Sequence, residues 1–229
     1  MICSRLTRTV RPGTVGGLPI DSAEEILLRC ARDLGRLDLR VLVESARHAG
    51  HADAIRMEVL LASGRPGVRL LRAVWESSTG RSDSGGESVL QEFHDVLEIR
   101  YEAQRKLYDA DGQLVAVADL WIVGTNRMHE YDGGVHRAPD VHRNDLRRER
   151  GLGRTGYERR GFTMDDLLNH ALVTMQEIDR DLARPSRLRR YRAWMALIEQ
   201  SLYSEVGRER VMNRWHRQMG VADWSRTAS

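Results

Sequence analysis

Three acidic residues lie in or just after a short apolar stretch in the middle of the chain, residues 115–136. Asp119 lies within Val-Ala-Val-Ala-Asp-Leu-Trp-Ile-Val, and Glu130 and Asp132 follow a Gly-Thr-Asn turn. Two part-apolar runs around such a turn predict a β-hairpin. An isolated ionised carboxylate in an apolar setting is costly unless a partner compensates it. The three acids therefore indicate a shared partner, and a divalent cation is the natural candidate.

Such a site would suit the hydrolysis of phosphodiester bonds. That reaction needs a water made nucleophilic and an anionic transition state neutralised, and a divalent metal does both. Mg²⁺ prefers a few carboxylate oxygens plus water. Glu87 is a further ligand candidate because it opens the helix predicted before the hairpin. We therefore expect a Mg²⁺ site, which Mn²⁺ would also suit, held by Glu87, Asp119 and Glu130.

The sequence argues against a membrane-spanning, secreted or disulfide-bonded protein. No run approaches the roughly 18 apolar residues that a membrane span needs. The amino terminus has no apolar signal core, so we expect a cytoplasmic protein without a membrane partner. The two cysteines, Cys3 and Cys30, argue against a disulfide framework or a cysteine zinc site.

The basic residues are almost all arginines. All but one of the 36 are arginine, and Lys106 is the exception. The net charge of +3 is too small to predict nucleic-acid binding, but the arginines crowd 143–160 and 184–217. Arginine side chains suit phosphate oxygens. The first cluster is either a phosphate-binding face beside the acids or an ordinary solvated helix face.

The pattern of apolar residues and breaks predicts five segments. Their limits are 1–20 for an extended tail, 21–77 for a helical unit, 78–86 for a Ser/Gly-rich linker, 87–184 for an α/β domain and 185–229 for a helical extension.

The α/β domain is expected to contain a mixed sheet flanked by helices. Its predicted elements, in order, are a helix (87–97), three antiparallel strands within 99–131, a basic helix (139–152), a strand (157–162) and a helix (163–183). A last amphipathic helical stretch covers 188–219. Its stripe around Trp194 is a packing seam or the surface of a homodimer.

Several short motifs recur in the same order in one known family. They are Gly17-Leu-Pro-Ile, Glu87-Ser, Val117-Ala-Asp-Leu, Glu130-Tyr-Asp-Gly with His136-Arg137, Arg143-Asn-Asp-Leu-Arg-Arg, Gly156-Tyr and Phe162-Thr163. On these motifs, residues 17–167 resemble the very-short-patch-repair-like endonuclease domain of the PD-(D/E)XK superfamily. Many proteins with this domain belong to the AbiEi-type antitoxin family of type IV toxin–antitoxin systems.

The resemblance implies a restriction-endonuclease-like fold and a set of functional residues. Its metal ligands would be Glu87, Asp119 and Glu130, with Asp132 and His136 beside them in the catalytic site. Contacts to DNA would come from its arginines, which here are Arg137, Arg143, Arg147 and Arg148.

The chain departs from the family pattern in two ways. The superfamily lysine, two residues after the second acid, is Asp132 here. The very-short-patch-repair branch shares that loss, and a histidine takes part in its chemistry. An amino-terminal winged helix–turn–helix is also common in such proteins, and we expect this chain to lack one.

Each acid also has a purely structural interpretation. Glu87 fits the last position of a helix-capping box that begins at Ser84. Glu130, at a strand end, is in a position to pair with an arginine. Asp132 precedes two glycines and suits a turn. His136 is either a surface residue or a proton carrier, for which its ordinary pKa is suitable.

Two functions follow from these alternatives. The leading one is Mg²⁺-dependent cleavage of DNA, with His136 assisting proton transfer. The other is a catalytically inactive, antitoxin-like or defence-associated module that binds a toxin or DNA. The nuclease interpretation requires Asp119 and Glu130 to lie close together, with no guanidinium group neutralising them.

Overall fold

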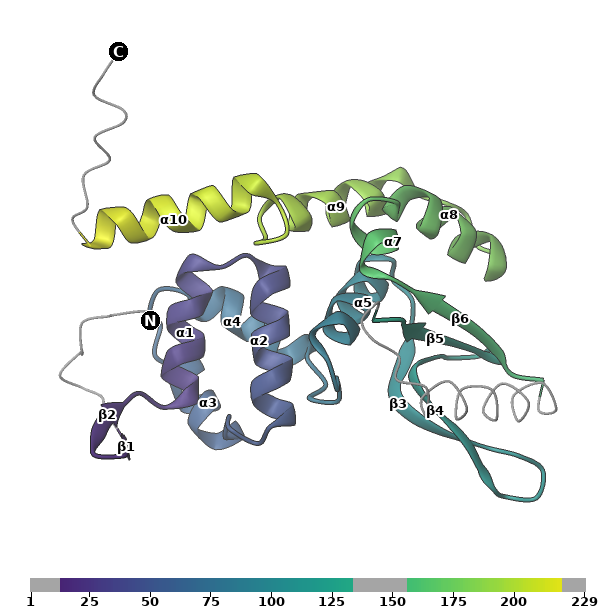
Figure 1. Cartoon of the computed structure of the whole chain (residues 1–229), viewed down its shortest axis with the longest axis horizontal. Helices are drawn as coiled ribbons and strands as arrows, with labels where there is room; N and C mark the ends of the chain where they lie inside the picture. Colours follow the sequence, from purple (N-terminus) through teal and green to yellow (C-terminus); the bar gives the residue numbers. More distant parts are fainter. Residues whose placement is uncertain (1–12, 134–155, 220–229) are drawn as a thin grey trace, which may run out of the picture.

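The computed structural model describes residues 13–133 and 156–219 (Figure 1). Its first element is a small hairpin of β1 (Gly13–Val15) and β2 (Leu18–Ile20). Gly16 and Gly17 turn the chain with φ angles of 56° and 80°, which suit glycine. The prediction of an extended tail was therefore wrong for this part, because the glycine pair closes a hairpin.

The predicted helical unit is confirmed as four helices. They are α1 (Ala23–Asp33), α2 (Arg36–His48), α3 (Ala54–Leu61) and α4 (Val68–Ser77). The N-cap of α1 is Ser22, whose hydroxyl accepts a hydrogen bond from the Glu25 N–H. Buried aliphatic residues of all four helices form one cluster, which includes Leu28, Leu39, Val43, Met57 and Leu71.

The predicted order of a helix, three antiparallel strands and a returning strand is confirmed. The elements are α5 (Gly85–Val96), β3 (Tyr101–Tyr108), β4 (Leu114–Ile122), β5 (Arg127–Tyr131) and β6 (Glu158–Phe162). The sheet order is β3-β4-β5-β6, with β6 parallel to β5. The basic helix predicted at 139–152 lies outside the described residues.

The chain ends, as far as it is described, in four helices. They are α7 (Met164–Leu168), α8 (Ala171–Asp181), α9 (Leu188–Glu199) and α10 (Glu205–Met219). The single helices predicted at 163–183 and 188–219 were wrong, because each is broken once. Helix α7 ends at its C-cap residue Asn169, whose N–H donates to the Asp165 carbonyl, and the His170 N–H donates to the same carbonyl over 3.2 Å. The second break follows α9. There the Ser204 hydroxyl caps the start of α10 by accepting a hydrogen bond from the Gly207 N–H over 2.9 Å.

One hydrophobic core draws on all three large predicted segments. Leu37 of α2, Phe93 of α5 and Trp194 of α9 belong to the same buried cluster. The Trp194 indole donates to the Leu167 carbonyl over 2.7 Å. This core covers the face of the sheet on which α5 lies (Figure 1). The proposed segment limits stay predictions.

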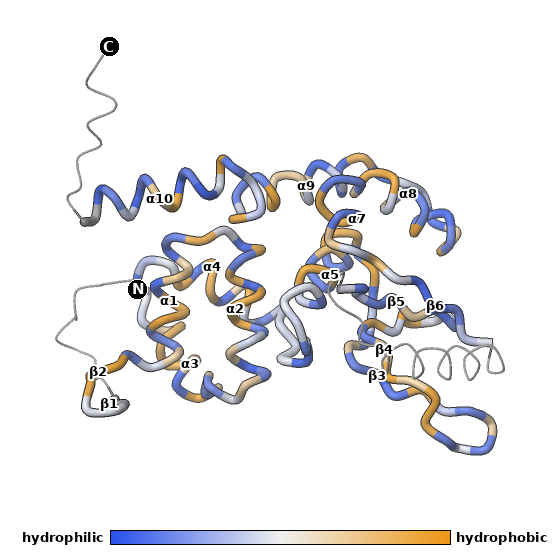
Figure 2. Tube along the Cα trace, viewed as in Figure 1, coloured by the Kyte–Doolittle hydropathy of each residue, from blue (hydrophilic) through white to orange (hydrophobic). Residues whose placement is uncertain are grey.

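The helix α10 lies beside α1 and α2 (Figure 1). Arg214 of α10 pairs with Asp33 of α1 over 2.8 Å, and Val211 is buried. Figure 2 shows that α10 is largely hydrophilic, with isolated apolar residues. A homodimer through this region stays a prediction. Among the described helices, none is both long and apolar enough to cross a membrane.

A buried arginine joins the helical unit to α5. Arg40 of α2 is fully buried, and its guanidinium lies 3.2 Å from Glu44, 3.3 Å from Glu92 and 3.1 Å from Asp95. Glu92 and Asp95 belong to α5 or its last turn, so the network spans both parts. Arg36 also contacts Glu92, but it is 28% exposed.

We predict that Arg40→Met lowers the free energy of unfolding by about 3–5 kcal/mol, because it leaves buried carboxylates without a counter-charge. The matched control is Arg36→Met, which removes a more exposed partner of the same Glu92 and should cost about 1 kcal/mol. Urea denaturation measures both values. Equal losses would contradict the role assigned to Arg40.

Two buried histidines form a pair between α5 and the sheet. The His94 Nδ1 lies 2.9 Å from the Leu90 carbonyl oxygen, and its Nε2 lies 2.7 Å from the His129 Nδ1. Because a carbonyl only accepts, the His94 Nδ1 carries the proton, and the His129 Nδ1–H donates to the His94 Nε2. Burial lowers the pKa of His94 to about 4 and that of His129 to about 2.

This pair makes the protein sensitive to acid. In the unfolded chain a histidine has a pKa of about 6.5, so the unfolded state binds more protons below that pH. The contribution of the pair to the free energy of unfolding has its full value above pH 6.5. It falls as the pH drops towards the folded pKa of His94, about 4.

The variant His129→Gln keeps a donor for His94 but has no side chain that titrates. We predict that its loss of stability between about pH 7 and pH 5 is smaller than that of the wild type by about 2 kcal/mol. Urea denaturation at both pH values tests this, and equal losses would refute it.

Candidate carboxylate site

The three predicted metal ligands come from neighbouring elements. Leu120 pairs with His129 across β4 and β5, so Asp119 and Glu130 occupy the next positions of adjacent strands. Glu87 lies in the first turn of α5. The strand pairing therefore places Asp119 beside Glu130, as expected for the predicted hairpin.

Gln104 connects two of these acids. Its side-chain Nε2 donates to the Glu87 carboxylate over 3.1 Å and to the Asp119 carboxylate over 3.4 Å. It lies on β3 between the residues that pair with Leu120 and Ala118, and its φ angle is 53°. A non-glycine residue in this region costs about 1–3 kcal/mol and persists where its surroundings demand it. Sequence reasoning missed Gln104, whose only signal is an uncharged polar side chain in a strand.

Glu87 is also part of a helix cap. The Ser84 hydroxyl donates to Glu87 over 2.9 Å, and the Asp83 N–H donates over 2.8 Å. The Glu87 N–H in turn donates to the Ser84 hydroxyl, so Ser84 is the N-cap, as predicted. The reciprocal bond of a capping box would come from the Ser84 N–H, and here the Glu87 carboxylate accepts from the Asp83 N–H instead. Burial raises the pKa of the Glu87 carboxyl, and these hydrogen bonds offset part of that shift.

Asp119 is held by the backbone of the next strand. The Tyr131 N–H donates to its carboxylate over 2.9 Å. The ring of Tyr131 lies against Gly86, where an added Cβ would come within 2.1 Å of a ring carbon. Gly86 therefore lets Tyr131 approach α5, and the Tyr131 backbone holds Asp119 in place.

Glu130 has a guanidinium partner. Its side chain is 4% exposed, and the Arg159 Nε lies 2.5 Å from its carboxylate. The same guanidinium contacts the Asp132 carboxylate over 3.0 Å. Met128 pairs with Arg159 and Glu130 with Gly161 across β5 and β6, so the parallel register brings Arg159 alongside both acids. The alternative in which Glu130 pairs with an arginine is confirmed.

These contacts do not fit the predicted set of Mg²⁺ or Mn²⁺ ligands. Glu130 is paired with a guanidinium, and an N–H donor lies between Glu87 and Asp119, where a cation would need oxygen ligands. Within residues 13–133 and 156–219, no group of three or more His, Cys, Asp or Glu side chains is arranged to hold a metal ion. The nuclease interpretation required Asp119 and Glu130 to lie close together with no guanidinium group neutralising them. The two acids are adjacent in the sheet, but Arg159 neutralises Glu130.

The other predicted site residues divide into two groups. Asp132 is described, and its N–H donates to the Phe162 carbonyl over 2.8 Å. Five lie outside the described residues, so their predicted roles are neither supported nor opposed: His136, Arg137, Arg143, Arg147 and Arg148.

Comparison of the chain with known protein families, curated proteins and solved structures found no match. The resemblance to the very-short-patch-repair-like endonucleases therefore stays a prediction. What the carboxylates do has to be inferred from their own contacts.

Gly161 is needed for the contact between Asp132 and Arg159. A Cβ on Gly161 would lie 1.8 Å from an Asp132 carboxylate oxygen. We predict that Gly161→Ala displaces this carboxylate and lowers the free energy of unfolding by about 1–3 kcal/mol. The control is Gly133→Ala, whose Cβ would meet nothing closer than 3.5 Å and should be close to neutral. Thermal or urea denaturation measures both, and equal stabilities would refute the prediction.

Proposed function

We propose that this chain is a restriction-endonuclease-like module that binds a partner protein, as an antitoxin-like or defence-associated protein would, and does not cut DNA. The observation that carries the proposal is the guanidinium of Arg159, which contacts both Glu130 and Asp132. It supplies the positive charge that a metal would have brought to these carboxylates.

The remaining acids point the same way. Glu87 and Asp119 accept hydrogen bonds from Gln104 and from backbone N–H groups. Buried or half-buried carboxylates with such partners are tolerated without a metal. The need for a shared cation, from which the metal prediction started, is therefore removed.

The described surface favours a protein partner over DNA. Large aliphatic side chains are exposed at Leu18, Ile55 and Val59, to 71%, 73% and 70%. Ile55 and Val59 are four residues apart on α3, so they share a face of that helix. Exposed apolar side chains that lie together are typical of protein contacts. Two arginines of β5 and β6 are neutralised by acids. Arg127 pairs with Glu158 and Asp181, and Arg160 pairs with Glu177 and Asp181.

The restriction-endonuclease-like fold belongs to the same proposal. Its support is the order of elements that the family resemblance implies, a helix, three antiparallel strands and a fourth strand parallel to the third. The acids that the resemblance places in the catalytic site include Asp119 and Glu130, which are adjacent on β4 and β5.

A divalent-metal-dependent DNA nuclease is the second candidate. The observation in its favour is that Glu87 of α5 and Asp119 of β4 accept hydrogen bonds from the same side chain, that of Gln104. Asp119 also lies beside Glu130. A bound Mg²⁺ would supply Lewis acidity and an activated water. This candidate requires Arg159 to leave Glu130 first.

Nicking of supercoiled plasmid DNA in Mg²⁺ or Mn²⁺ separates the two candidates. We predict that the wild type nicks no faster than Asp119→Asn, since the carboxylates are already paired. The matched control is Glu76→Gln, an exposed acid on α4. Metal-dependent nicking that falls on the order of 100-fold in Asp119→Asn, but not in the control, would overturn the proposal.

Arg159→Gln provides an independent test. Removing the guanidinium leaves Glu130 buried without its counter-charge, which should cost about 3 kcal/mol of stability. We predict that this variant still does not nick DNA. If it gains metal-dependent nicking that Asp119→Asn abolishes in the same background, the nuclease candidate is the better one.

A further inference from the structure

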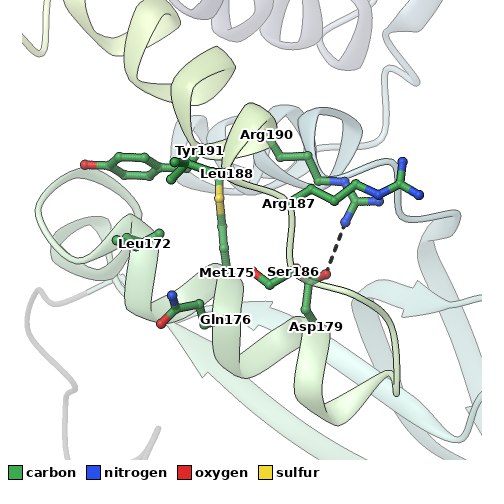
Figure 3. A pocket seen from close by; sticks show the side chains of 9 residues that line it. All are labelled: Leu172, Met175, Gln176, Asp179, Ser186, Arg187, Leu188, Arg190 and Tyr191. Carbon is green, nitrogen blue, oxygen red and sulfur yellow. Dashed lines mark hydrogen bonds and ion pairs between the residues drawn. The ribbon is translucent and has the colours of Figure 1, made fainter.

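A hollow of about 260 Å³ lies between α8 and α9, on elements that the carboxylate site does not use. Nine residues line it (Figure 3): Leu172, Met175, Gln176, Asp179, Ser186, Arg187, Leu188, Arg190 and Tyr191. Its volume suits one or two side chains of a bound segment.

The two ends of the hollow differ in chemistry. In Figure 3, Leu172 and Tyr191 lie at one end, Met175 lies between, and the guanidinium groups of Arg187 and Arg190 lie at the other. The apolar end opens to water, because Leu172 is 36% exposed. Leu188, which also lines the hollow, is 52% exposed.

The sequence around the hollow is rich in arginine, although Arg189 and Arg190 pair with Glu98, and Arg184 pairs with Asp179. Between residues 179 and 192 the sequence has arginine at 180, 184, 187, 189, 190 and 192, against aspartate at 179 and 181. Asp179 is buried and lies 2.9 Å from Arg184 and 3.4 Å from Arg190. The one acid that lines the hollow is therefore neutralised and does not repel a negatively charged partner.

We infer that this hollow docks an acidic segment of another protein, which inserts one aliphatic or aromatic side chain. The anchor would cover Leu172, Met175 and Leu188, and acidic residues beside it would meet Arg187 and its neighbours. Charge complementarity of this kind selects partners and guides their encounter.

A nucleic acid fits the hollow less well. Its backbone would match the arginines but would leave the aliphatic end in water, and burying aliphatic surface is worth about 25 cal/mol per Å². Buried apolar anchors dominate most protein interfaces. This inference is independent of the proposed function, since a nuclease could carry the same docking surface.

Selection from a random displayed peptide library against the full chain tests the inference. We expect the enriched peptides to combine Asp or Glu with a Leu, Ile, Phe or Trp anchor. Their affinity should fall about tenfold for Leu172→Glu and for Arg187→Glu, which is 1.4 kcal/mol. The matched controls are Leu114→Glu on β4 and Arg69→Glu on α4, both exposed and outside the hollow.

Every other outcome counts against the proposal. No enrichment, enriched peptides that are basic or lack an anchor, or equal affinity for all four variants would overturn it. A labelled DNA duplex that binds the wild type and loses affinity only in Arg187→Glu would assign the surface to nucleic acid instead. Circular dichroism of each variant checks that the fold is kept.

Discussion

Ion pairs that neutralise buried charges connect the helices and strands of this protein. Arg40 connects α2 to α5, Arg159 connects β6 to the end of β5, and Arg190 connects α9 to α8. In each case a guanidinium reaches carboxylates from another element. A buried charge without such a partner would cost several kcal/mol, so these pairs constrain how the helices and strands can pack.

The same constraint decides how the carboxylate site is interpreted. Acids gathered at the end of a sheet indicate a metal when nothing else neutralises them. Here Arg159 contacts Glu130 and Asp132, and Gln104 donates to Glu87 and Asp119. Asp119 and Glu130 are adjacent, as expected for the predicted hairpin, and the contacts of these acids are the ground for the proposed binding role. The proposed docking hollow at α8 and α9 would be a second surface for such a role.

Most of the elements could be predicted because their signals are local. Alternating apolar residues indicated β3, β4 and β5, and capping residues such as Ser22 and Ser84 marked the start of helices. The errors arose where the helical hydrogen-bond pattern is interrupted, as where the His170 N–H donates to the Asp165 carbonyl instead of the Asp166 carbonyl. The hairpin at Gly16 was missed because turn chemistry was taken as a sign of irregular chain.

The sequence by itself predicted that Asp119 and Glu130 would be neighbours, because the register of a hairpin follows from nearby residues. It also offered the capping role of Glu87, since Ser84 is three residues away. Only the tertiary structure decided which side chains neutralise these acids or donate hydrogen bonds to them. Arg159 follows Glu130 by 29 positions and reaches it through the parallel pairing of β6 with β5. Gln104 reaches Glu87 through the packing of α5 on the sheet. Such partners depend on the register between distant segments, which no local pattern encodes.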